Sequence, residues 1–425
     1  MSILNAATNH FFSKSNSAYF WRQSMRSPLT EKVNLLLLGL AFILIGLNLR
    51  PILASVGPLL PSIQKDISLS FTLASMLTLL PVLAMGLGCF AGFSIAKRLG
   101  FNTVMTGSLL LLIAATAMRF WAIDANWLIC SALLAGVAIA LIQTIMPAMI
   151  KLNFGERVPL MMGLYVTAIM GGAALAASSA PFIGMNLGWR AGLGHWTWLG
   201  IFALVLWLLI KHKAALPSQA KEQALQLNFW RFRRSWLLAI FFALGTSCYV
   251  CVLAWLAPYA VELGYSQTQS GLVLGFLTSM EVIAGLVFPW LASKSTDRRA
   301  IIALLCLLQL IGFMGLALAP QVSLFLWAGL AGLGIGGIFP LGLIVTMDHQ
   351  QNPMLAGKLT AFVQGVGYTI AAISPWIAGL IRDNFNSFNS AWLLLGGLSV
   401  IAWILSWQFN PQGYARQYQI TRCVS

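Results

Sequence analysis

The sequence predicts an all-α polytopic membrane protein with twelve transmembrane helices in two pseudo-symmetric six-helix halves. Three observations predict this fold: an apolar composition, twelve apolar stretches long enough to cross a bilayer, and residues, mostly prolines, that recur in the second half of the sequence at a nearly constant spacing. Of the 425 residues, 59% are hydrophobic and only 8% are charged, whereas a soluble domain carries about 25% charged residues. The composition therefore excludes a soluble globular protein.

Each of the twelve stretches holds enough apolar residues to span about 30 Å of hydrocarbon. We expect spans at 33–60, 70–96, 101–121, 127–150, 158–182, 193–210, 235–259, 268–292, 299–319, 322–347, 356–381 and 389–409. The segment 211–234 is polar and basic, and it separates the two sets of six spans. The predicted divisions are a cytoplasmic tail at 1–32, a bundle at 33–210, a basic linker at 211–234, a second bundle at 235–409 and a second cytoplasmic tail at 410–425.

The basic residues fix the orientation of the chain in the membrane. Twenty of the 25 Lys and Arg residues lie on the side that holds the N-terminus, and only Lys65, Arg119, Arg190 and Arg382 lie on the other. By the positive-inside rule, we expect both termini to be cytoplasmic. The basic residues behind the net charge of +15 thus orient the protein in a lipid bilayer, so we expect no nucleic-acid partner. We also expect no cleaved signal peptide, and we expect the protein to be a monomer.

Several residues of the first half of the sequence, mostly prolines, have a counterpart in the second half at a nearly constant spacing. Pro61 and Pro258 are 197 positions apart, as are Lys97 and Lys294. Ala74 and Gly271 share this spacing, while the pairs Pro147/Pro340 and Pro181/Pro375 are 193 and 194 apart. Two six-helix repeats, related by an axis along the membrane normal with substrate bound between them, resemble the major facilitator transporters.

Arg50 is the only Lys or Arg well inside any of the apolar stretches. A bare guanidinium near the bilayer centre costs at least ~2.5 to 3.5 kcal/mol, so it normally faces the protein interior or a watery cavity. It is permanently charged, and its planar fork of donors fits small oxyanions and carboxylates. We therefore expect Arg50 to bind an anion that crosses the membrane. The alternative is a structural arginine, neutralised by helix carbonyls or a buried acid.

Two loops are similar to the conserved loops of the major facilitator superfamily. The segment GFSIAKRLG at 92–100 has the small, basic and glycine residues of that pattern but lacks its Asp. The counterpart in the second half keeps Asp297 beside Arg298. The resemblance implies gating loops at the cytoplasmic ends of the halves, formed by Lys97, Arg98, Asp297 and Arg298, with a weakened latch on the N-terminal side.

A more specific likeness lies in five segments. They are GLNLRP at 46–51, SVGPLLP at 55–61, IQTIMP at 142–147, MDH at 347–349, and AGKL at 356–359 with FVQGVG at 362–367. These segments resemble the cyanate and nitroimidazole transporter family, and in particular its cyanate permeases. The likeness runs through nearly all of both halves, and it implies a carrier of a small planar or linear solute.

The remaining candidate binding residues follow from combining this likeness with the chemistry of cyanate. Cyanate is a linear monovalent anion with acceptors at both ends, so Arg50 would bind one end while neutral donors bind the other. Gln143 and Gln364 lie in matching segments and are such donors, although an interhelical hydrogen bond is an equal alternative for each. Trp255 and Tyr368 are candidates for the cavity wall, with packing as their alternative role.

Glu281 is the only acidic residue deep in any span. A buried carboxyl there either carries a proton or serves as a fixed counter-ion to Arg50. The resemblance does not extend to this position, because the cyanate permeases have a neutral amide at the matching place. The family therefore gives no support for an essential proton site at Glu281.

Together these observations predict a secondary transporter of a small anion, such as cyanate, that works by alternating access. Import would be either proton-linked or driven by consumption of the anion inside the cell. The rival is an exporter of nitroimidazole or other small organic drugs. We expect no enzymatic activity, because the spans hold no cluster of nucleophile, base or metal ligands. No metal or cofactor is expected, and no phosphate-binding loop is present for ATP.

Overall fold

The computed structural model describes residues 28–214, 227–350, 353–385, 387–414 and 418. Most of the predicted N-terminal tail and part of the basic linker, including Lys221, lie outside these residues. Within the described residues all regular structure is helical, and twelve helices or helix pairs are long and apolar enough to cross a membrane. This confirms the predicted all-α polytopic fold.

The first half contains six membrane spans built from ten α-helices that are joined by short turns. In chain order they are α2 (Pro28–Leu47), α3 (Pro51–Ala54) and α4 (Val56–Asp66), α5 (Phe71–Ala74) and α6 (Met76–Leu99), α7 (Phe101–Ala117), α8 (Ala125–Phe154), α9 (Val158–Leu187), and α10 (Trp189–Gly194) with α11 (Thr197–Ile210). The first half therefore has one membrane span for each of its six predicted stretches.

The second half repeats this arrangement with six more spans. They are α12 (Arg233–Glu262), α13 (Gln267–Ala292), α14 (Arg299–Leu318), α15 (Leu324–Asp348), α16 (Pro353–Ala371) with α17 (Ser374–Phe385), and α18 (Asn389–Ser406). The repeat seen in the sequence has a structural counterpart, because Pro147 and Pro340 lie inside α8 and α15, the fourth span of each half. Pro61 and Pro258 likewise lie inside helices of the first and seventh spans.

The first predicted stretch, 33–60, is not one continuous helix. Helix α2 ends at Leu47, and α3 begins at Pro51 after a three-residue break. Proline lacks a backbone N–H and disfavours helical geometry in the residue before it, so Pro51 suits the first turn of a new helix and weakens the continuation of the preceding one. Two tight backbone bonds, from Asn48 N to Ile45 O and from Leu49 N to Gly46 O, both at 3.1 Å, close the last turn. The break places Arg50 at the N-terminal end of α3.

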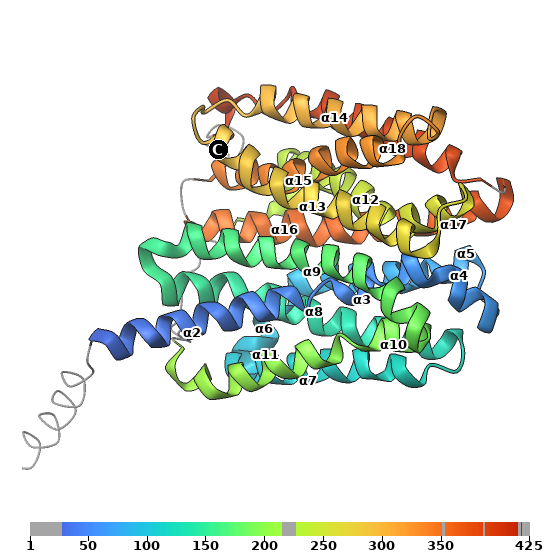
Figure 1. Cartoon of the computed structure of the whole chain (residues 1–425). Coiled ribbons are helices and arrows are strands. Elements are labelled where there is room, and N and C mark those ends of the chain that lie inside the picture. The colour runs from blue at the N-terminus through green and yellow to red at the C-terminus, as the bar shows by residue number, and fades with distance from the viewer. Residues whose placement is uncertain (1–27, 215–226, 351–352, 386, 415–417, 419–425) are drawn as a thin grey trace, which may run out of the picture.

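The two halves pack side by side, and their helices run in roughly the same direction across the picture, with the first half below and the second above (Figure 1). Helices α9 and α13 form one seam between them, and α6 and α16 form another. The α9–α13 seam depends on glycine, because a Cβ atom built on Gly275 would lie 2.0 Å from the Ser178 hydroxyl oxygen. A Cβ on Gly271 would lie 2.4 Å from the Ala177 carbonyl oxygen. A larger residue at Gly271 would therefore push the halves apart, whereas at Gly275 the Ser178 hydroxyl would have to rotate away.

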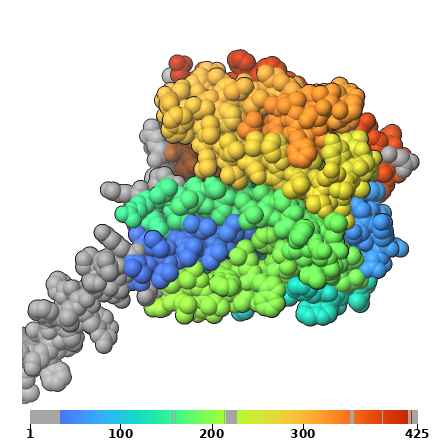
Figure 2. Space-filling view, in the orientation of Figure 1, coloured from blue at the N-terminus to red at the C-terminus, as the bar shows by residue number. Residues whose placement is uncertain are grey.

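The two ends of the bundle differ in how the halves meet. We call the end that holds Lys97, Lys151 and Arg298 the basic end. At the other end, the far end, Ser62 donates a hydrogen bond to Gln267 at 2.9 Å across the halves, and the Thr72 backbone N–H donates to Asp383 at 2.9 Å. The space-filling view shows the surface hollowed between the halves at the left, the end at which α2 begins (Figure 2).

Candidate functional site

Arg50 is buried at the centre of the bundle. Its side chain is 2% exposed and contacts α6, where its Nη1 lies 3.4 Å from the sulfur of Met85. On the other side, its guanidinium carbon lies 5.5 Å from the centre of the Tyr249 ring on α12. Its Nε has no hydrogen-bond partner. A permanently charged group thus sits between the two halves with donor capacity unused.

Three tyrosines from three helices surround this guanidinium. Tyr249 on α12, Tyr368 on α16 and Tyr165 on α9 all interact with it electrostatically. The hydroxyl groups of Tyr165 and Tyr249 are buried and have no hydrogen-bond partner. Buried polar groups are normally satisfied, so unused donors beside a cation indicate a place for a ligand that accepts hydrogen bonds.

No carboxylate neutralises Arg50 by direct contact. None of the ion pairs formed by the described residues, for which nitrogen and oxygen lie within 4.0 Å, includes Arg50. Moving an ion from water into a protein interior without a partner costs roughly several kcal/mol of desolvation free energy. An anion bound at Arg50 would remove that cost.

Glu281 lies across the interface on α13 and is 1% exposed. Neither of its carboxyl oxygens has a hydrogen-bond partner. The charge of Arg50 acts on this carboxyl, although the two groups do not form an ion pair within 4.0 Å. The backbone of Glu281 packs closely against Gly336 of α15, where a Cβ atom would lie 2.4 Å from the Glu281 Cα and carbonyl oxygen. This contact fixes the backbone of Glu281 at mid-span.

A cavity of about 420 Å³ lies between the halves and reaches Tyr249 and Glu281. It is lined by α9 of the first half and by α12, α13 and α15 of the second. Met162, Pro289 and Met347 also line it, and each lies near the helix end at the basic end of the bundle. The cavity therefore runs from mid-span toward the basic end, and Tyr249 belongs both to the cavity wall and to the surroundings of Arg50.

The structure gathers some of the predicted binding residues but not all of them. Tyr368 lies beside Arg50, and Gln364 lies one helical turn away on the same face of α16. Gln143 on α8 is half-buried, and among the described residues neither it nor Gln364 lines the cavity or contacts Arg50. Trp255 donates a hydrogen bond to the Pro375 carbonyl oxygen at 2.9 Å and packs against aromatic rings away from the cavity lining.

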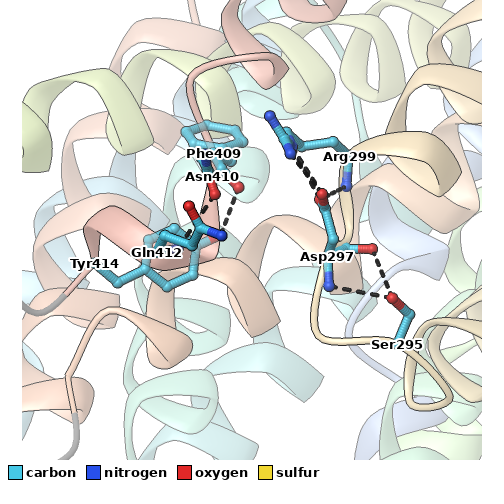
Figure 3. A network of polar contacts seen from close by, with 7 residues as sticks. All are labelled: Ser295, Asp297, Arg299, Phe409, Asn410, Gln412 and Tyr414. Carbon is cyan, nitrogen blue, oxygen red and sulfur yellow. Dashed lines mark hydrogen bonds and ion pairs between the residues drawn. The ribbon is translucent and has the colours of Figure 1, made fainter.

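The predicted gating residues lie at the basic end. Lys97 and Arg98 are exposed in the last turn of α6. Asp297 forms an ion pair with Arg299 at 2.6 Å, and hydrogen bonds from Arg299 hold the pKa of the Asp297 carboxyl below its usual value. Arg298 pairs with Asp348 at 3.5 Å. Both pairs lie within the second half. Figure 3 shows the Asp297–Arg299 pair beside Phe409, Asn410, Gln412 and Tyr414.

The sequence reasoning missed Tyr165, Tyr249 and Met85. Aromatic residues make up 12% of the chain, so most of them are packing residues and none stood out. One signal was available, because tyrosine is rare here: the chain has only eight, and three surround Arg50. Tyr249 also lies two residues after Ser247, the residue 197 positions from Arg50.

Twelve membrane spans in two repeated halves, with a buried charge and a cavity between them, define a secondary membrane transporter. The sequence of residues 36–369 matches the model of the Major Facilitator Superfamily. The chain is also 36% identical over 373 residues to the cyanate transport protein CynX of Escherichia coli strain K12, covering 88% of this chain and 97% of that protein. The chain therefore belongs to the Major Facilitator Superfamily, and within it to the family of that cyanate transport protein.

Other relatives and solved structures agree with this assignment. The 2-nitroimidazole transporter of Escherichia coli strain K12 is 27% identical over 377 residues, covering 88% of this chain and 94% of that protein. The solved structure of the xylose transporter XylE from E. coli has a TM-score of 0.72 at 14% identity, covering 91% of this chain and all of that one. At that identity the structural likeness shows the fold alone.

Proposed function

We propose that this protein transports a small monovalent anion, with cyanate as the first candidate, by alternating access between the two halves. One observation carries the proposal. Arg50 is fully buried between the halves without a carboxylate in contact, and hydroxyl groups without partners surround it. A guanidinium and neutral donors at mid-depth match an anion with acceptors at both of its ends. The 36% identity to a cyanate transport protein supports the same substrate.

The proposal extends to orientation and assembly. We infer that the basic end faces the cytoplasm, because 20 of the 25 basic residues lie there in the sequence. The cavity would then open inward. A single chain supplies Arg50, the three tyrosines and both cavity walls, so the transporter would work as a monomer.

Energetics constrain how such an anion would enter a cell. Moving one negative charge into a negative interior costs roughly 2.3 kcal/mol per 100 mV. One proton per anion cancels this electrical cost, and consumption of the anion inside the cell would also draw it in. Glu281 is the candidate proton carrier, because its carboxyl is buried at mid-span with both oxygens unpartnered. Its other proposed role is that of a fixed counter-ion to Arg50.

The direct test is uptake of labelled cyanate by proteoliposomes that contain the purified protein. Uptake above that of protein-free liposomes, with competition by unlabelled cyanate, is the expected result. A thermal-shift screen against cyanate, thiocyanate, nitrate and formate would rank the anions, because a ligand that binds the native state raises its apparent stability. No shift and no uptake with any of the four anions would refute an anion carrier.

A second candidate function is export of nitroimidazole or another small organic compound. Two observations favour it: the cavity of about 420 Å³ is far larger than a three-atom anion requires, and a 2-nitroimidazole transporter is a relative. Direction separates the two functions. Cells that carry an importer accumulate the labelled solute, whereas cells that carry an exporter exclude it.

A further inference from the structure

The cavity between the halves has a chemistry that a small anion does not use. Its walls are mostly apolar and include Met162, Val166, Met170 and Ile335. Its lining contains no Lys, Arg or His, and Arg50 is not part of it. Methionine-rich walls adapt to ligands of different shape, so this chamber suits an organic body much larger than cyanate.

The only ionisable carboxyl in this lining is Glu281. Its side chain is 1% exposed, and neither oxygen has a hydrogen-bond partner. An isolated buried carboxylate is costly, and an opposite charge placed against it in a low-dielectric site is strongly attracted. The cavity therefore offers one unpartnered carboxyl group in an otherwise apolar lining, and a bound cation would hold that group in its ionised form.

Two aromatic rings add to the attraction for a cation. Tyr249 and Phe339 both line the cavity, from α12 and α15. The face of an aromatic ring is negative, and it stabilises organic cations such as quaternary ammonium groups. Tyr249 also lies against Arg50. Because Arg50 repels a cation, the positive charge of a ligand must lie on the Glu281 side of the chamber.

We propose that this cavity binds an organic monocation with an apolar body, such as an alkyl- or arylammonium or a phosphonium ion, with Glu281 as its counter-ion. The apolar walls bury the body, while the carboxylate and the aromatic faces bind the charge. This site adjoins the proposed anion site at Arg50 and shares Tyr249 with it, but it does not depend on cyanate being the substrate.

The test measures binding of labelled tetraphenylphosphonium to the purified protein in lipid nanodiscs, with protein-free nanodiscs as the blank. Two competitors of the same shape isolate the charge: benzyltrimethylammonium is cationic, and neopentylbenzene is its neutral carbon analogue. We expect the first to displace the probe and the second to displace it far less. Equal displacement by both would show an apolar chamber without a cation site and would overturn the proposal, as would no specific binding of the probe.

Two variants assign the site. Glu281→Gln keeps the shape of the side chain and should weaken tetraphenylphosphonium binding by roughly thirtyfold or more, the cost of losing one member of a buried charge pair. Gly163→Leu tests the cavity itself, because Gly163 lines it and has no atom within 4 Å of a built Cβ. The added side chain should block the probe without straining the backbone.

A matched control separates occlusion of the cavity from general damage. Gly107→Leu makes the same change on the exposed surface of α7, where a built Cβ also meets no atom within 4 Å. This variant should bind the probe as the wild type does. Wild-type binding by both Glu281→Gln and Gly163→Leu would overturn the proposal. The cyanate measurements are made with a different ligand, so either result leaves the anion hypothesis to its own test.

Discussion

Tyr249 and Arg50 lie 5.5 Å apart, from ring centre to guanidinium carbon, although they belong to opposite halves of the transporter. Arg50 precedes α3 in the first half, and Tyr249 lies in the middle of α12 in the second. If the protein works by alternating access, as proposed, one half would rock against the other around a central site, and a contact across the halves at mid-depth would change during the cycle. A ligand that binds both residues would therefore contact both halves at once.

Replacing Arg50 is the first test of the anion site. Arg50→Ala should weaken cyanate binding by roughly thirtyfold or more, because the buried charge that attracts the anion is gone. Arg50→Lys should lose most uptake as well, since a point charge cannot reproduce the planar fork of donors. Uptake by proteoliposomes measures both effects, and the amount of folded protein in the membrane is the control. Uptake like that of the wild type by Arg50→Ala would remove this residue from the substrate site.

The tyrosine hydroxyls make a second prediction. Tyr249→Phe and Tyr165→Phe each remove one unpartnered hydroxyl beside Arg50. If these hydroxyls donate to the anion, each loss should weaken binding by about tenfold, the value of a hydrogen bond to a charged group. Tyr259→Phe is the matched control, because its hydroxyl donates to the Leu316 carbonyl oxygen at 2.5 Å, away from the site. Cyanate affinity should be unchanged in that control, while stability falls.

The membrane fold follows from the sequence because the bilayer fixes the length of every helix. Apolar length alone located the twelve spans. Arg50 and Glu281 could also be found, since a charge inside an apolar stretch is rare and the chain has so few charged residues. The tyrosines could not be singled out in this way. Their importance comes from which helices meet, and that depends on close contacts such as Gly275 against Ser178.

The broken first span shows a second limit of the sequence. Pro51 did not stand out as a helix boundary, because proline is common inside membrane helices and several here, such as Pro147 and Pro340, do not end their helices. Whether a proline ends a helix depends on its neighbours. At Leu47 the chain lies so close to α9 that a Cβ atom on Gly172 would be 2.2 Å from the Leu47 carbonyl oxygen.

Glu281 and Arg50 make a third prediction, which concerns coupling. If Glu281 carries the proton, Glu281→Gln should abolish uptake driven by a pH gradient and preserve exchange of cyanate between the two sides. If Glu281 is instead the counter-ion, the stability losses of Arg50→Ala and Glu281→Ala should be non-additive by about 0.5 to 3 kcal/mol. Thermal unfolding of the two single variants and the double variant measures this coupling.

Between these two roles, we favour that of counter-ion to Arg50 when no organic cation is bound. The charge of Arg50 acts on Glu281, and a neutralising acid requires only that both groups be buried within reach. Additive losses would reject the pairing, while normal gradient-driven uptake by Glu281→Gln would reject the proton carrier. The two outcomes come from different measurements, so each role is tested by itself.

The last prediction concerns His349, at the basic end of α15. Its Nε2 accepts a hydrogen bond from Arg234 at 2.9 Å, and its Nδ1 lies 2.6 Å from the Val345 carbonyl oxygen. The ring stacks on Tyr414 at 3.8 Å between ring centres. This pattern requires a neutral imidazole that donates from Nδ1, because a protonated Nε2 would oppose the Arg234 donor. Burial, together with the charge of Arg234, lowers the pKa of His349 to about 4.

A depressed pKa for a base makes the folded state sensitive to acid. The unfolded chain binds a proton to this histidine at about pH 6.5, whereas the folded protein binds it only near pH 4. The unfolded state therefore holds more protons between these values, and the stability that neutral His349 contributes is complete above pH 6.5 and is lost as the pH falls toward 4. His349→Gln keeps an acceptor for Arg234 but has no titratable group. Thermal unfolding in detergent measures this effect: the unfolding temperature of the variant should fall less than that of the wild type between pH 7 and pH 5. Equal slopes would show that folding does not lower the pKa of His349.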